Sequence, residues 1–306
     1  MLVVFQRHPL TKAALSWTRI DSESICASYS GDPCQSLLLS WNTHSIPEKT
    51  LEFSIQVRAG DESWSQELPV AHWGEKSRKG FREGSPDLLS IDIDLIHSKR
   101  PITDFRVQVR GNIAELRRLT IAQKVSRVTA PTEVLPEAVV DLGVPERSQR
   151  TIESEHSHRL CSPTSVAMVL QSFGLSCDAR ELAHYVYDQA NDVYGNWSLN
   201  VAYAGALGFD ASALWLPDLR SIERLIAAGL PVVVSHKFAE GELTESPMEK
   251  TEGHLLVIRG FTKQGDVIVN DPAADPRKEE SVRRVYPRLA FAKTWSGLCY
   301  LIHPSH

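Results

Sequence analysis

The chain has 306 residues, about twice the length of a typical domain, so two domains are expected. Hydrophobic residues make up 42% and charged residues 23%, which is typical of a folded globular protein and excludes a largely disordered one. The net charge of -5 gives no electrostatic reason to expect a nucleic-acid partner.

The start of the chain and its hydropathy bear on localisation. No apolar run approaches the roughly 18 residues that a membrane-spanning helix needs. The first residues, MLVVFQRHPL, lack the basic start, long apolar centre and small-residue cleavage site of a secretory signal. We therefore expect no membrane span and a cytoplasmic protein, with secretion left open.

Residues 1–128 carry the alternation of apolar and polar residues that is typical of β-strands. In TLEFSIQVR (50–58) and TDFRVQVR (103–110) every second residue is apolar, so one face of each strand is buried. Turn sequences such as AGDE and RGN separate these segments. Several short strands at this spacing predict an all-β sandwich domain.

An accessory domain of this kind suggests a glycan or protein ligand. Trp41, Trp64 and Trp73 could form a stacking platform for sugars, although large aromatic residues more often lie in the core. The tryptophans therefore leave the two interpretations open, with the core interpretation favoured.

The pattern of apolar and polar residues changes after residue 128. Residues 129–147 hold Pro131, Pro136 and Pro145 and show no sustained periodicity, which predicts a linker. In residues 148–306, helical stripes such as PTSVAMVLQSFG come first and apolar strand-like runs such as GHLLVIRGF come later. Helices followed by consecutive strands predict an α+β domain.

Five cysteines are present, and an odd number leaves at least one unpaired within the chain. Their spacing forms no CxxC pair and no zinc-ligand pattern, so we expect no metal and no cofactor. Cys161 directly precedes SPTSVAMVL, a helical stripe that begins at Ser162 or Pro163. A thiol at a helix N-terminus has a lowered pKa, as a nucleophile requires, although a lone buried cysteine is more often a packing residue.

Two further residues are candidates for partners of this thiol. His254 stands at the beginning of an apolar strand, and Asp271 lies 17 residues later, just after the next strand. A hairpin would return Asp271 to the level of His254, where a carboxylate can orient an imidazole. Asn270 could take the same role as a neutral amide, and Asp271 could instead be a turn residue before a proline.

These motifs together resemble the papain-like cysteine peptidases of the bacteriocin-processing-like family, cysteine peptidase family thirty-nine. The resemblance rests on CSPTSVAMVL, GHLLVIRGF and DVIVNDPAA in this order and covers residues 143–303. It implies a papain-like fold for the second domain, with Cys161 as nucleophile and His254 as general base and then acid. It also implies Asp271 as the orienting group. The full expectation is an α+β papain-like cysteine peptidase domain (148–306) preceded by an all-β sandwich (1–128).

The oxyanion donor departs from the simplest pattern of papain-like folds. The position six residues before Cys161 is Glu155, which cannot donate when ionised. Gln149, in VPERSQ, is twelve residues before the cysteine and resembles the VPxxSQ motif of the family. The resemblance therefore implies Gln149 as the donor, with a solvated loop glutamine as the alternative.

The expected function is that of a thiol hydrolase, a peptidase or amidase that acts on a peptide or another amide-containing substrate through an acyl-enzyme. Two alternatives stay open: an inactive binding protein that recognises a glycan or protein through the β-sandwich, and an acyltransferase. The chain lacks the phosphate loop of the transporter-linked members of the family, so leader-peptide cleavage is not implied. The glutamate-rich segment 238–253 is interpreted as a solvated loop or as a lid over the cleft.

Overall fold

The computed structural model describes residues 2–8, 11–14, 16–21, 23–60, 62–84, 88–124, 126–129 and 133–305, with only the backbone of 2–8, 11–14, 16–19 and 31–32. The chain forms two compact units. Unit 1 comprises Met1–Val125 and Val186–Leu214, and unit 2 comprises Ser126–Tyr185 and Trp215–His306.

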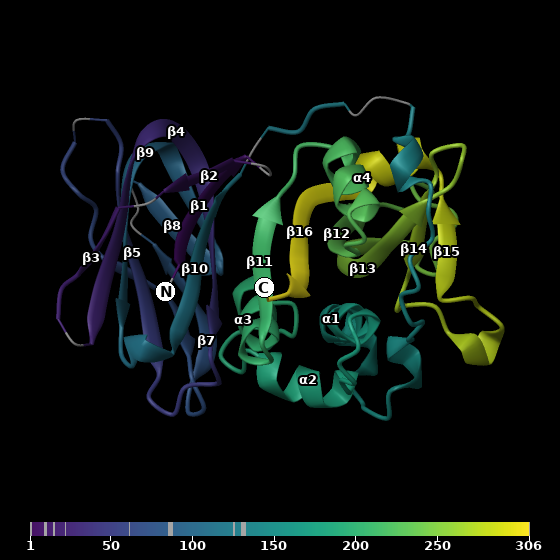
Figure 1. Ribbon diagram of the computed structural model, residues 1–306, viewed down its shortest axis with the longest axis horizontal. Helices are drawn as coiled ribbons and strands as arrows, with labels where there is room; N and C mark the ends of the chain where they lie inside the picture. The colour runs from purple at the N-terminus through teal and green to yellow at the C-terminus, as the bar shows by residue number, and fades with distance from the viewer. Residues whose placement is uncertain are drawn as a thin grey trace. The chain divides into compact units, whose positions relative to one another are not determined.

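Unit 1 is built on antiparallel strands that belong to one continuous sheet (Figure 1). Along the sheet the order is β2-β1-β10-β4-β9-β5-β6-β7-β8, with β3 paired to β4 and with β1 parallel to β10. The strands are β1 (Leu2–His8), β2 (Thr11–Ala14), β3 (Ser16–Arg19), β4 (Ser24–Thr43), β5 (Leu51–Arg58), β6 (Leu68–Trp73), β7 (Arg78–Gly84), β8 (Leu89–Ile93), β9 (Leu95–Arg110) and β10 (Leu116–Gln123).

Besides β4, the long strand β9 pairs with two different strands of this sheet along its length. Its second half pairs with β5, and its first half pairs with β8, so the hydrogen bonding returns to β9 after passing through β5, β6, β7 and β8. The sequence predicts two sheets packed face to face. The all-β character of residues 2–124 agrees with that expectation, whereas a division into two separate sheets stays a prediction.

The core of unit 1 holds the aromatic residues that the alternation places on the buried face. Trp41 and Trp73 are fully buried, and Trp41 stacks on Phe53 with ring centroids 4.0 Å apart. Trp64 is half-buried, with the guanidinium of Arg106 3.9 Å from its ring centroid. Trp41 and Trp73 are therefore core residues, and a sugar platform built from all three tryptophans is excluded.

Residues 186–214 pack with unit 1 although they follow the nucleophile helix in the sequence. They hold α3 (Trp197–Ala206) and begin β11 (Phe209–Trp215). Asn42 on β4 donates to the carbonyl of Ala211 and accepts from its N–H, at 3.0 and 3.1 Å. The compact units thus differ from the linear division at residue 128, and the domain boundaries read from the sequence stay a prediction.

The segment predicted as a linker is tied to unit 2 along most of its length; residues 130–132 lie outside the described residues. The N–H of Leu135 donates to Glu223, and Asp141 pairs with Gly260 as an isolated bridge. A Cβ on Gly260 would lie 1.8 Å from the carbonyl oxygen of Val140. Only glycine permits this close approach, so the segment is docked onto the strand that carries Gly260.

Unit 2 contains an antiparallel sheet in which five strands follow the order β16-β12-β13-β14-β15 (Figure 1). The strands are β12 (Val232–Phe238), β13 (Thr251–Phe261), β14 (Val267–Asn270), β15 (Arg283–Tyr286) and β16 (Trp295–Pro304). The helices of the unit are α1 (Cys161–Ser172), α2 (Ala179–Val186), α4 (Leu219–Ala227) and α5 (Arg288–Thr294). In the described part of the chain, no helix has both the length and the apolar composition needed to cross a bilayer.

Helix α1 forms where the sequence predicts it and is anchored to the sheet. Pro163 lies in its first turn, and Gly174 follows its end with φ +90, a conformation that glycine adopts without strain. The hydroxyl of Ser165 donates to the carbonyl of Leu255 on β13 at 3.3 Å, and Ser162 contacts Tyr300 on β16 at 3.0 Å. These contacts hold the N-terminal turn of α1 against the strands.

Candidate active site

Cys161 is the first residue of α1, and its thiol is half-buried. The N-cap residue Leu160 has no side chain that caps the free N–H groups of the first turn, so those groups favour a negative charge on the sulfur. Burial alone would raise the pKa of the thiol. The hydrogen bond and positive charge of His254, together with the N–H groups of Leu255 and Ser162, outweigh burial and lower that pKa.

The other four cysteines have the opposite character. Burial raises the pKa of Cys34 to about 12 and that of Cys177 to about 11, and it also raises the pKa values of Cys26 and Cys299. Cys161 is therefore the one cysteine of the five whose surroundings favour the thiolate, which is the nucleophilic form.

His254 lies on β13, and its side chain is buried. Its Nε2 is 2.7 Å from Oδ1 of Asp271. Burial by itself would lower the pKa of the imidazole, but the charge and hydrogen bond of Asp271, with a further contribution from the Cys161 thiolate, raise it to about 10. The geometry therefore favours an imidazolium between a thiolate and a carboxylate.

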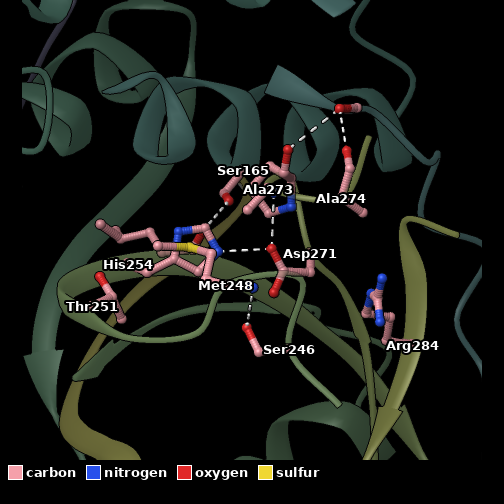
Figure 2. A network of polar contacts seen from close by, with 12 residues as sticks. Ser165, Ser246, Met248, Thr251, His254, Asp271, Ala273, Ala274 and Arg284 are labelled. Carbon is pink, nitrogen blue, oxygen red and sulfur yellow. Dashed lines mark hydrogen bonds and ion pairs between the residues drawn. The ribbon is translucent and has the colours of Figure 1, made fainter. Parts of the chain in front are cut away.

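Asp271 follows the last residue of β14 and is fully buried. Because β13 and β14 are antiparallel neighbours, the turn between them returns the chain to His254, as the hairpin argument predicts. Oδ1 accepts hydrogen bonds from His254 and from the N–H of Ala273, and Figure 2 shows both contacts. Although burial would raise the pKa of this carboxyl, the charge of His254 and these hydrogen bonds lower it.

Asn270, the alternative third residue, has other partners. Its amide nitrogen donates to the carbonyls of Val144 and Pro145, both at 3.1 Å, and its oxygen accepts from Arg259 at 2.9 Å. Asn270 thus connects the proline-rich segment to β14, and the structure places Asp271 against His254.

Gln149 lies in a short 3-10 helix (Gln149–Thr151) and is buried. Its backbone N–H donates to the carbonyl of Pro272 at 2.9 Å, so this residue is held beside the segment that carries Asp271. Its side-chain oxygen has no hydrogen-bond partner in the described part of the chain. No described hydrogen bond joins the Gln149 amide to Cys161, and the oxyanion role stays a prediction. Glu155, in contrast, is exposed.

Two residues of the site are not predicted by the sequence. Tyr286, at the end of β15, donates from its hydroxyl to Oδ2 of Asp271 at 2.6 Å. His236 on β12 stands directly opposite His254 in the strand pairing, and its Nδ1 is 2.8 Å from Oγ1 of Thr294. Burial, followed by the positive charge of His254, lowers the pKa of His236 to about 3, so this second imidazole is neutral. Neither residue belongs to a sequence motif. Strand pairing and the packing of the elements bring both to the site.

A cavity of about 630 Å³ lies elsewhere in unit 2. Ser148 and Thr151 line it on either side of Gln149, and α1 contributes Thr164 and Gln171. The three residues of the Cys161, His254 and Asp271 arrangement are absent from its described walls. Among the residues that the structure describes, no group of three or more His, Cys, Asp or Glu side chains could hold a metal ion.

Comparison with solved structures finds the crystal structure of the peptidase domain of Streptococcus ComA, described as a bi-functional ABC transporter involved in a quorum sensing pathway. The two share 21% sequence identity, with a TM-score of 0.34, over 48% of this chain and 93% of that chain. Among curated proteins, no sequence matches this chain.

A comparison with family models identifies residues 141–301, more than half of the chain, as a match to the Peptidase_C39 like family. The matched residues include Cys161, Gln149, His254 and Asp271. The chain therefore belongs to the Peptidase_C39 like family and carries a cysteine-peptidase-like domain in its C-terminal half.

Proposed function

We propose that this protein is a thiol hydrolase, a peptidase or amidase, that uses Cys161, His254 and Asp271 as a catalytic triad. The observation that carries the proposal is the buried arrangement in which His254 bonds Asp271 at 2.7 Å and lowers the pKa of the Cys161 thiol. The lowered pKa favours the nucleophilic thiolate form of Cys161, whereas burial raises the pKa of the other four thiols and favours their protonated form.

The chemistry follows from these roles. The thiolate of Cys161 attacks the carbonyl carbon of the scissile amide, and the carbonyl oxygen becomes an oxyanion. The His254 imidazolium gives its proton to the leaving amine as the C–N bond breaks, which leaves a thioester on Cys161. Neutral His254 then takes a proton from water, the resulting hydroxide attacks the thioester, and the carboxylic acid and the thiolate are released.

The oxyanion requires hydrogen-bond donors that are already in place. The N–H of Cys161 is one donor, since it belongs to the free first turn of α1. The amide of Gln149 is proposed as the other. Support for this role comes from the hydrogen bond between the Gln149 backbone and Pro272, which holds the residue next to Asp271.

The proposal assigns the chemistry to unit 2, which contains all three residues of the triad. The β-strand domain of residues 1–128 is proposed as an accessory domain, with a glycan or a protein as its ligand.

The test is alkylation by iodoacetamide at pH 6, followed by mass mapping of all five cysteines. We expect Cys161 to be modified at least about tenfold faster than Cys26, because the surroundings of Cys161 lower the pKa of its thiol whereas burial raises that of Cys26. The preference is lost in His254→Ala and kept in His303→Ala, a matched histidine variant of β16. Equal, slow labelling of Cys161 and Cys26 in the wild type contradicts the proposal. A peptide-library cleavage screen with Cys161→Ala as the control then identifies the substrate class.

A further inference from the structure

Strand β15 carries two side chains on one face, one of which contacts Asp271 and the other the segment 238–253. Arg284 and Tyr286 are two residues apart, so their side chains lie on one face of the strand. Tyr286 is fully buried and donates to Oδ2 of Asp271 at 2.6 Å. Arg284 donates from Nη1 to the carbonyl oxygen of Glu245 at 2.7 Å. One short strand therefore contacts both the triad carboxylate and the glutamate-rich segment 238–253.

The contact with this segment is continued by Ser246. The side chain of Ser246 interacts with the Tyr286 phenol. The Ser246 hydroxyl oxygen also accepts from the N–H of Met248 at 3.1 Å (Figure 2). Leu243, three residues earlier, is buried. The middle of the segment is thus packed against the protein, while Glu240 and Glu249 near its two ends are exposed.

The bonds at Asp271 divide between its two oxygens. Oδ1 accepts from His254 and from the N–H of Ala273, while Oδ2 accepts from Tyr286. A carboxylate that is bonded at both oxygens cannot rotate without breaking one set of bonds, so the Tyr286 bond fixes the plane in which Oδ1 meets the imidazole. A buried carboxylate without the Tyr286 donor would also be less stable in its charged form.

Tyr286 acts as a donor throughout the pH range in which enzymes work. Burial, the charge of Asp271 and the hydrogen bond to that carboxylate raise the pKa of the phenol well above its ordinary value, and Arg284 and Ser246 oppose this rise only in part. The phenol is therefore protonated, and its proton points to a carboxylate that cannot donate in return.

We propose that Tyr286 is a positioning residue of the Cys161–His254–Asp271 site, which holds the outer oxygen of Asp271 and couples that carboxylate to the segment 238–253. This inference rests on the proposed thiol chemistry. It adds a fourth residue to the site. It also implies that the packing of segment 238–253 affects the pKa of Cys161 through Tyr286, Asp271 and His254.

The direction in which Tyr286→Phe shifts the pKa of Asp271 follows from the charged groups around that carboxylate. Among the described residues, the titratable or charged side chains around this centre are those of His254 on β13, the neutral His236 on β12, Cys161 on α1, and Tyr286 and Arg284 on β15. In Tyr286→Phe the carboxylate loses one donor, so it takes up a proton at a higher pH than in the wild type. Protonation of Asp271 removes the partner of the imidazolium, and the thiolate of Cys161 is then lost at a higher pH as well.

The experiment measures the rate of Cys161 alkylation by iodoacetamide between pH 4 and pH 9. In Tyr286→Phe we expect the acid limb of the profile to move upward by about half to one pH unit, and the plateau rate to fall about threefold to tenfold. In Ser246→Ala we expect a smaller shift in the same direction. Tyr203→Phe, the same substitution at a buried tyrosine of α3, should superimpose on the wild type.

The outcomes separate the two proposals. If wild-type Cys161 shows no preferential labelling at low pH, the proposed thiol chemistry fails. If the wild type shows it and Tyr286→Phe, folded by its circular dichroism, follows the wild-type profile, the positioning role alone fails. Should Tyr286→Phe not fold, the profile of Ser246→Ala decides, and a profile identical to that of the wild type overturns the inference.

Discussion

At the scale of single residues, the three candidate residues of the site and the residues that contact them differ in the signals that they leave in the sequence. Cys161, His254 and Asp271 are recognisable because each belongs to a motif with its own local signal: a helix start, a strand start and a strand end. Tyr286 and His236 carry no such signal, since each reaches the site through pairing with a neighbouring strand and no motif marks that pairing. A polar segment such as RRVY does not indicate that its last residue bonds a buried carboxylate.

The first residue-scale prediction concerns the third member of the triad. In Asp271→Asn the imidazolium loses its charged partner, and we expect the pKa of His254 to fall from about 10 by about 1–3 pH units. The pKa of Cys161 rises in turn, and alkylation of Cys161 at pH 6 slows at least about tenfold. The measurement is the pH profile of alkylation, supported by NMR titration of the His254 imidazole.

Asn270→Ala is the neighbouring control. The substitution removes the amide that donates to the carbonyls of Val144 and Pro145, and we expect it to lower the free energy of unfolding by about 1–3 kcal/mol. The pH profile of Cys161 alkylation should keep its position. A shifted profile in Asn270→Ala, with an unshifted one in Asp271→Asn, would reverse the assignment of the third residue.

At the scale of secondary structure, the long and periodic elements are predictable and the short ones are not. Helix α1 follows its apolar stripe, and β13 follows its apolar run, because burial on one or both faces leaves a pattern in the sequence. In contrast, β15 has four residues and α5 has seven, too few for a period to be read. Residues 133–147 lack any periodicity because their order comes from tertiary contacts with β13 and α4.

The element-scale prediction tests that docking. In Gly260→Ala the new methyl group meets the carbonyl oxygen of Val140 at 1.8 Å, so β13 and residues 140–141 must separate. We expect a loss of roughly 2–4 kcal/mol in the free energy of unfolding, measured in urea, and faster hydrogen exchange at Phe261, whose N–H donates to Val140. Gly143→Ala, where a methyl group meets nothing within 4 Å, is the matched control and should change stability by less than about 1 kcal/mol. Equal stability of the two variants would contradict the docking.

At the scale of the whole molecule, the sequence predicts two domains divided near residue 128, and the structure groups the chain into two compact units of different composition. The change of texture near residue 128 is visible because all-β and α+β regions have different periodicities. The inclusion of residues 186–214 in unit 1 depends on contacts over more than a hundred positions, such as the hydrogen bond between Asp188 and the N–H of Gly80 at 2.7 Å. Contacts of this kind leave no local pattern, so a single sequence does not reveal them.

Asp94 makes the stability of unit 1 depend on pH where residues 186–214 pack. The residue is buried in unit 1 and accepts hydrogen bonds from the N–H groups of Trp197 and Ser198, at the start of α3. Burial raises its pKa from 3.8 to about 7; the N–H groups oppose this rise, and the nearby charge of Asp188 adds to it. A carboxyl whose folded pKa exceeds its unfolded pKa stabilises the fold fully below the unfolded value, and the stabilisation is lost as the pH rises through the folded value.

We therefore expect Asp94 to lower the free energy of unfolding between about pH 4 and pH 7, by up to about 4 kcal/mol. The measurement is urea unfolding of the wild type and of Asp94→Asn at pH 4, 5.5 and 7. Because other carboxylates change stability in both proteins, the difference between the two curves isolates the contribution of Asp94. That difference should shift in favour of Asp94→Asn as the pH rises, and exchange of the Trp197 amide should accelerate in the wild type alone. A difference that is constant across this range would show that Asp94 has the same pKa in the folded and unfolded chain, and the burial of its charge at α3 would then have no energetic consequence.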